Sequence, residues 1–106
     1  MNDEPTEIDE DGDKFWKNSE GKLHRDHDLP AVIGNDGYCA WYKEDTIHRD
    51  NNLPAIIWPN SWCEWWVEDK LVREKRCTKK EIEQYKKPFY FNVKFNRFEN
   101  LIKKGG

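Results

Sequence analysis

Apolar and polar residues alternate over short stretches along most of this chain, which is the pattern of β-strands rather than of helices. Residues 38–43 and 62–67 are aromatic-rich runs of this kind. Gly, Pro, Asn, Asp and Ser residues, which are typical of turns, separate the runs. Pro30 precedes the first run and Pro54 lies between the two, and each excludes a continuous helix through the middle of its repeat unit. The pattern therefore predicts hairpins of short strands.

Side chains alternate between the two faces of a strand, so each aromatic-rich run has a core face and an opposite face. We expect the core face to carry Cys39, Trp41, Cys63, Trp65 and Val67. The opposite face of the second run carries Trp62, Glu64 and Trp66. The last thirty residues contain several Phe residues that could cover that opposite face. Without such cover, its Trp side chains are exposed.

The chain contains an internal repeat with a period of 24 residues. Residues 47–57 match residues 23–33, and residues 63–69 match residues 39–45. A weaker echo follows at residues 71–74, and an earlier Trp-containing strand begins at residue 14, which makes about two and a half copies. Stacked copies bury each other's apolar faces. We therefore expect a mainly β fold, an antiparallel β-hairpin repeat meander over residues 14–74.

The sequence after residue 74 leaves this pattern. Thr78 and Glu81 have the spacing of a capping box, which predicts a short helix as far as about Lys86. Beyond Pro88, alternation over residues 89–95 predicts a strand, and Asn96 begins a second short helix. A repeat stack needs an atypical terminal element, so residues 75–106 are predicted to be an α/β capping segment.

Charge is distributed unevenly, although the net charge is only −3. Residues 1–13 hold seven acidic side chains and no Lys or Arg, and we expect a flexible tail there. Residues 70–106 hold twelve basic and four acidic side chains. An odd number of cysteines, three, argues against a disulfide framework and favours an intracellular protein, cytoplasmic or nuclear. No apolar run is long enough to span a membrane.

The residues Trp41-Tyr42-Lys43, then Ile47-His48-Arg49-Asp50 and Leu53-Pro54-Ala55, resemble the MORN-variant repeats of bacteria and large DNA viruses. The resemblance covers roughly residues 14–74. It implies antiparallel β-hairpins that serve as interaction modules, with no catalytic residues to carry over. A viral member of this family would act inside the host cell.

The triplet His-Arg-Asp occurs twice, and it also occurs in the catalytic loop of protein kinases. That loop needs further motifs and a much larger domain. Because the triplet recurs at the repeat period, we interpret it as structural: each Arg pairs with acidic or carbonyl groups at the turn before the proline and holds the copies in register. The structural repeat residues are His24, Arg25, Asp26, Pro30, His48, Arg49, Asp50 and Pro54.

Histidines and cysteines could also form a zinc site, but zinc ligands usually occur as closely spaced pairs. The only such pair is His24 and His27, and the second of these becomes Asn51 in the next copy. Cys39 and Cys63 occupy equivalent core positions, where a free thiol acts as a small apolar group. We therefore expect no metal and no cofactor.

These observations favour a non-enzymatic protein-interaction or structural repeat module over an enzyme. The expected contact residues are Tyr42, Trp62 and Trp66, and the expected partner is a protein, self-association included. The alternative is a nucleic-acid or anionic-surface binder that uses the basic C-terminal third. Its basic patch would comprise Arg73, Lys75, Arg76, Lys79 and Lys80. Neither hypothesis involves a small-molecule substrate.

Overall fold

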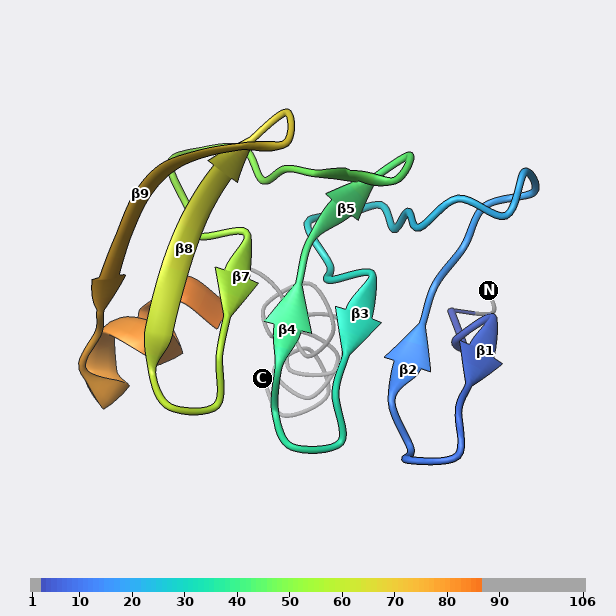
Figure 1. Cartoon of the computed structure of the whole chain (residues 1–106), viewed down its shortest axis with the longest axis horizontal. Helices are drawn as coiled ribbons and strands as arrows, with labels where there is room; N and C mark the ends of the chain where they lie inside the picture. The colour runs from blue at the N-terminus through green and yellow to red at the C-terminus, as the bar shows by residue number, and fades with distance from the viewer. Residues whose placement is uncertain (1–2, 87–106) are drawn as a thin grey trace, which may run out of the picture.

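The computed structural model describes residues 3–86, and the strand and second helix expected after Pro88 lie outside these residues. The strands are β1 (Glu7–Ile8), β2 (Lys14–Phe15), β3 (Val32–Ile33), β4 (Cys39–Ala40), β5 (Tyr42–Lys43), β6 (Thr46–Ile47), β7 (Ile56–Ile57), β8 (Trp62–Val67) and β9 (Lys70–Arg76). Residues 79–86 form a helix. Figure 1 shows the strands following one another across a curved sheet. The predicted fold class, an antiparallel hairpin meander with a short helical cap, is confirmed.

Seven strands form one antiparallel sheet in the order β1-β2-β3-β4-β7-β8-β9, and β5 and β6 form a separate small hairpin. The pairs β1–β2, β3–β4 and β7–β8 are three successive copies of one hairpin. Their turns place Gly12, Gly37 and Ser61 at equivalent positions, with φ of 87°, 102° and 76°. Two glycines meet this left-handed requirement without strain, and Ser61 adopts it as an exception.

The first hairpin changes the predicted domain boundaries. β1 pairs with β2, with Glu7 opposite Phe15 and Ile8 opposite Lys14. The turn between them is closed by a hydrogen bond from the Asp9 N–H to the Asp13 carbonyl, 3.0 Å long. The repeat region therefore begins within residues 3–13, which we expected to be a flexible tail. The flexible tail was predicted from the acidic composition. The strands of this hairpin are only two residues long, which is too short for an alternating pattern to indicate them.

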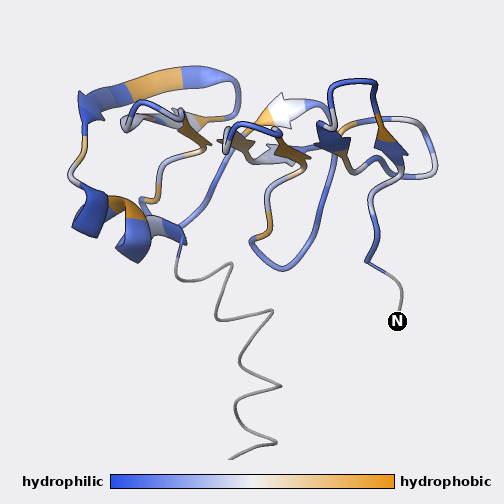
Figure 2. Ribbon diagram, turned by 90° about the horizontal axis from the view of Figure 1, so that it is seen from below, coloured by the Kyte–Doolittle hydropathy of each residue, from blue (hydrophilic) through white to orange (hydrophobic). Residues whose placement is uncertain are grey.

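The two faces of the sheet hold two different apolar clusters. On one face, Cys39, Trp41, Ala55, Ile57, Cys63, Trp65 and Cys77 form a buried cluster, and Ile82 and Tyr85 of the helix pack against it. We call this the helix-covered face; Figure 2 shows the helix beneath the sheet. On the other face, Val32, Ala40 and Ile56 are buried beneath a ring of partly buried side chains that includes Phe15, Tyr38, Tyr42 and Trp66.

The predicted core face is correct for Cys39, Trp41, Cys63 and Trp65, which are all buried, but wrong for Val67. The β8–β9 register shifts between Trp65 and Trp66. The extra residue is Val72 on β9, so the alternation along β8 itself continues. Val67 is 41% exposed because it lies at the end of β8, next to the hairpin tip, as does the exposed Lys43 in the preceding copy.

The repeat array ends at β9 because the chain there no longer leaves the sheet. In the preceding copy the chain leaves the sheet after β4 to form the β5–β6 hairpin and a loop, and Ile56 returns to pair with Ala40. In the last copy it continues straight on, and Glu74 pairs with Glu64 in the equivalent place. The helix follows at once, started by the predicted capping box: Thr78 N–H donates to Glu81 (2.8 Å), and Glu81 N–H donates to Thr78 Oγ1 (3.1 Å).

Candidate functional site

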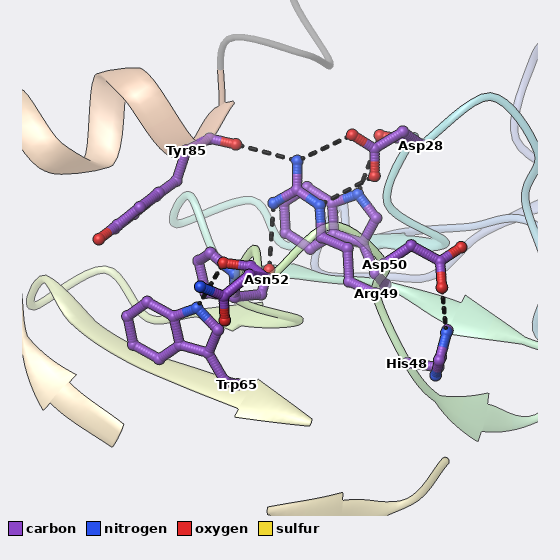
Figure 3. A network of polar contacts seen from close by, with 9 residues as sticks. Asp28, His48, Arg49, Asp50, Asn52, Trp65 and Tyr85 are labelled. Carbon is purple, nitrogen blue, oxygen red and sulfur yellow. Dashed lines mark hydrogen bonds and ion pairs between the residues drawn. The ribbon is translucent and has the colours of Figure 1, made fainter. Parts of the chain in front are cut away.

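The repeated Arg residues lie at the junctions between copies. Arg49 is only 4% exposed, and its guanidinium stacks on the ring of Trp41 at 3.9 Å. It donates to both carboxylate oxygens of Asp28 (2.9 and 3.1 Å), to the Pro54 carbonyl (3.1 Å) and to the Tyr85 carbonyl (2.9 Å), as Figure 3 shows. Burial lowers the pKa of Arg49, and Asp28 opposes that shift. This side chain joins two repeats and the helix.

The same unit, an indole, a guanidinium and a carboxylate, occurs in the first copy and decays in the last. Arg25 stacks on Trp16 at 3.7 Å and binds Asp3 and the Pro30 carbonyl. In the last copy, Arg73 lies 4.6 Å above Trp65 but is exposed on β9. Asn52 occupies the place of Asp28 there. The carboxylate is replaced where the guanidinium is no longer buried.

The histidines of the triplets connect loops to hairpin tips. His48 Nδ1 accepts the N–H of Glu68 (3.1 Å), so its proton lies on Nε2, which donates to Asp50 (2.7 Å). His24 makes the same contacts with Glu44 and Asp26. Because both ring nitrogens are engaged in these bonds, we assign His24 and His48 a structural role.

Each copy also forms a shallow groove between its loop and its Trp strand. One groove, of about 190 Å³, is lined by residues that include His24, Asp28, Trp41 and Lys43. The second groove, of about 200 Å³, is lined by the positions 24 residues further along, including His48, Asn52, Trp65 and Val67. The grooves are therefore a property of the repeat, polar in the first copy and more apolar in the second.

The six Trp residues divide into two sets according to what their indole N–H groups bind. Trp16, Trp41 and Trp65 each donate at 3.0 Å to the backbone carbonyl 13 residues earlier. The other three lie on the face opposite the helix and donate to carboxylates: Trp58 and Trp66 to the two oxygens of Glu64 (2.8 Å each), and Trp62 to Glu74 (3.1 Å). We call Tyr38, Tyr42, Trp58, Trp62, Trp66, Glu64 and Glu74 the aromatic face.

Trp62, Trp66 and Tyr42, the contact residues named from the sequence, are half-buried members of the aromatic face. Sequence reasoning missed Trp58, which is 40% exposed, and Tyr38, whose ring centroid lies 4.7 Å from that of Trp58. Tyr38 was expected in the first aromatic-rich strand and Trp58 lies before the second one, but neither was named as a contact residue. The signal that could have identified them is the register of β7 against β8, which places Trp58 next to the Glu64 strand. Burial raises the pKa of Tyr38 to about 12.

The basic residues named from the sequence do not form one patch. Arg73 and Lys75 pair with Trp65 and Cys63, on the helix-covered side of β9, whereas Arg76 pairs with Trp62 on the aromatic face. Lys75 forms an ion pair with Glu81 at 2.8 Å, which raises the pKa of Lys75 and lowers that of Glu81. The exposed Lys79 and Lys80 lie in the first turn of the helix.

The three thiols are buried, and all of them belong to the one apolar cluster on the helix-covered face. Burial raises the pKa of Cys63 to about 12, with a further contribution from the neighbouring Cys77. Within residues 3–86, the one group of three potential metal ligands is a set of turn carboxylates, Asp9, Asp11 and Asp13, rather than the histidines and cysteines considered above. Asp9 already accepts two backbone N–H groups of its own turn.

Comparisons with protein-family models, with curated proteins and with solved structures find no match for this chain. Among the described residues, no helix has the length and apolar character needed to cross a membrane.

Proposed function

We propose that this chain is a non-enzymatic interaction module, of the kind that MORN-variant repeats form, and that it binds a protein partner on the aromatic face. The observation that carries the proposal is the second set of Trp residues. Trp58 is 40% exposed, Trp62 and Trp66 are partly exposed, and their polar atoms bind side chains of the same face. Large, rigid aromatic side chains on an accessible face are the residues that most often dominate protein interfaces.

A neighbouring apolar residue supports the same location. Leu71, which is 43% exposed, pairs with Trp66 at the end of the sheet. Exposed apolar surface that adjoins aromatic side chains commonly marks an interaction site. The alternative partner, a nucleic acid bound by the basic residues, has less support because those residues are divided between two faces and one of them pairs with Glu81.

The proposal is tested by measuring partner capture with matched variants. Proteins retained by the immobilised chain are identified, and each is then purified and titrated against the wild type, Trp58→Ala and Trp62→Ala. Val72→Ala serves as the control because Val72 is 61% exposed and lies outside the aromatic face. We expect the aromatic variants to weaken binding at least about tenfold and the control less than about twofold, as for hot-spot and peripheral residues.

Nuclease treatment and a salt series complete this test. Binding to the aromatic face should survive nuclease and should lose less affinity as salt rises than binding through several phosphate contacts, which weakens steeply. Capture that is lost with nuclease, or that is equal for Trp58→Ala, Trp62→Ala and the wild type, would contradict the proposed function and favour the basic residues.

A further inference from the structure

The repeats themselves show how this protein combines an indole with a carboxylate. In the buried unit, the Arg49 guanidinium lies 3.9 Å from the Trp41 ring centroid while it donates to both oxygens of Asp28. The first copy uses Arg25, Trp16 and Asp3 in the same way. Each of these two units thus contains an indole ring, a guanidinium and a carboxylate. The guanidinium stacks on the ring and donates hydrogen bonds to the carboxylate.

The aromatic face contains two of these parts without the third. The Glu64 carboxylate lies between the indoles of Trp58 and Trp66 and accepts one N–H from each, at 2.8 Å. Within residues 3–86, no ion pair involves Glu64 and no cation lies over the ring of Trp58 or Trp66. The neighbouring Trp62 does have a cation, Arg76, at 6.0 Å. Within residues 3–86, Glu64 is therefore the carboxylate of this face that two indoles hold and that has no cation beside it.

The chemistry of this arrangement favours a cation from outside. Two indole N–H bonds hold the carboxylate in place but leave its full negative charge uncompensated. They also fix the two rings beside it, so that little side-chain freedom remains to be lost on binding. A guanidinium is planar, stacks on aromatic rings and donates to carboxylates at the same time, which an ammonium group does less well.

We infer that Glu64, Trp58 and Trp66 form a binding site for an arginine side chain of the partner, presented by an extended basic segment. The inference rests on the proposed function and specifies its partner: the segment lies across the aromatic face and supplies the guanidinium that Arg49 and Arg25 supply within the repeats. Glu74 beside Trp62 adds a second negative charge along the same face.

The test uses synthetic peptides and the six indole N–H resonances of the ¹⁵N-labelled chain. The probe is a glycine–serine peptide with arginine at alternate positions, compared with the same peptide carrying lysine or glutamine there. We expect the arginine peptide to shift the Trp58 and Trp66 resonances while those of Trp16, Trp41 and Trp65 stay in place. The lysine peptide should bind more weakly, and the glutamine peptide should not bind.

Glu64→Gln removes the charge and keeps one acceptor oxygen, so it should weaken binding of the arginine peptide at least about tenfold. Glu83→Gln, an exposed carboxylate on the helix, is the matched control and should change the affinity less than about twofold, because distant surface charges are screened. If Glu64→Gln does not give six dispersed indole resonances, Trp58→Ala replaces it. This substitution removes one ring of the site, and it should leave the fold intact because Trp58 is 40% exposed.

Equal binding by Glu64→Gln and the wild type, or shifts confined to Trp16, Trp41 and Trp65, would overturn the arginine site. If partner capture still depends on Trp58 and Trp62, the interaction face stands and only the arginine inference fails. If partner capture does not depend on them either, the proposed function fails with it.

Discussion

At the scale of single residues, an indole N–H has one donor to satisfy, and this chain satisfies it in two ways. Trp41 binds a backbone carbonyl of its own repeat and lies in the core, 3% exposed. Trp58 binds a carboxylate side chain and remains 40% exposed. The first kind of bond holds the repeat together, and the second orients a ring at the surface.

Arg49 is the residue on which most contacts between repeats converge. Replacing it by Met keeps much of the apolar stem but leaves Asp28 without its guanidinium. We expect Arg49→Met to lower the free energy of unfolding by about 3 kcal/mol, since removing one partner of a buried ion pair leaves the other charge uncompensated. Urea denaturation should show a lower midpoint with an unchanged slope.

Arg73→Met is the control for this measurement. Arg73 also stacks on a Trp ring but is exposed on β9, so its loss should cost no more than about 0.5 kcal/mol. Equal effects of the two substitutions would mean that the buried contacts of Arg49 add nothing to the stacking.

At the scale of elements, the hairpin tips decide how the copies stack. The two-residue tips have positive φ at both positions, 49° and 68° at Glu44 and Asp45 and 47° and 69° at Glu68 and Asp69. Such turns match the twist of the strands but suit Asn and Gly better than Glu. The second tip residue is kept as Asp because its carboxylate accepts a backbone N–H from the preceding copy, that of Ile47 in the case of Asp69 (2.9 Å).

Adjacent substitutions in this tip should therefore act in opposite directions. Glu68→Asn relieves a backbone conformation that Glu tolerates poorly, and we expect it to raise the free energy of unfolding by about 0.5 kcal/mol. Asp69→Ala keeps the unfavourable φ and removes the acceptor for Ile47, so it should lower that free energy by about 1–2 kcal/mol. Thermal and urea unfolding of both variants measure the difference. A loss of stability in Glu68→Asn would show that the Glu68 side chain contributes more than its conformation costs.

At the scale of the whole molecule, the sheet has a closed side and an accessible side. The helix covers Cys63 and Trp65 through Ile82 and Tyr85. On the opposite side, only the small or branched residues Val32, Ala40 and Ile56 are buried, and aromatic side chains surround them. The side under the helix therefore supplies most of the core, and the proposed interaction belongs to the opposite side.

Buried titratable groups on both sides of the sheet should make the fold sensitive to alkaline pH. The pKa of Cys63 is raised from 9.0 to about 12 and that of Tyr38 from 10.0 to about 12, both chiefly because burial disfavours the charged form. The fold therefore favours the protonated groups: the resulting stability is complete below pH 9, where both states are protonated. It is lost as the pH rises from about 9 towards 12, because the unfolded chain ionises first.

We expect the urea midpoint to be lower at pH 10.5 than at pH 7.5, and the difference to be smaller in Cys63→Ala. The comparison between the two proteins isolates the thiol from the other alkaline groups. An identical pH dependence in both proteins would contradict a buried, neutral Cys63.

The 24-residue period, the strands and the capping box are local features, and local features are readable from a sequence. Matching residues such as Arg25 and Arg49 predict matching contacts, and Thr78 with Glu81 predicts a helix start because both partners lie within one turn. Turn chemistry likewise indicated where the hairpins reverse. These elements depend on interactions between near neighbours in the chain.

The remaining features depend on register between distant strands, which no local pattern specifies. The register of β9 against β8 places Val67 opposite Lys70 at the end of the sheet, where its side chain is 41% exposed. Glu7 and Ile8 in the acidic stretch form a strand because β2, paired with β3 on one side, offers its other edge for pairing. The arrangement at Glu64 exists because the β7–β8 pairing places Trp58 beside β8. The indole of Trp58, six residues before Glu64, and that of Trp66, two residues after it, therefore both donate to the Glu64 carboxylate. Sequence determined which residues repeat, and tertiary pairing decided which of them face the outside.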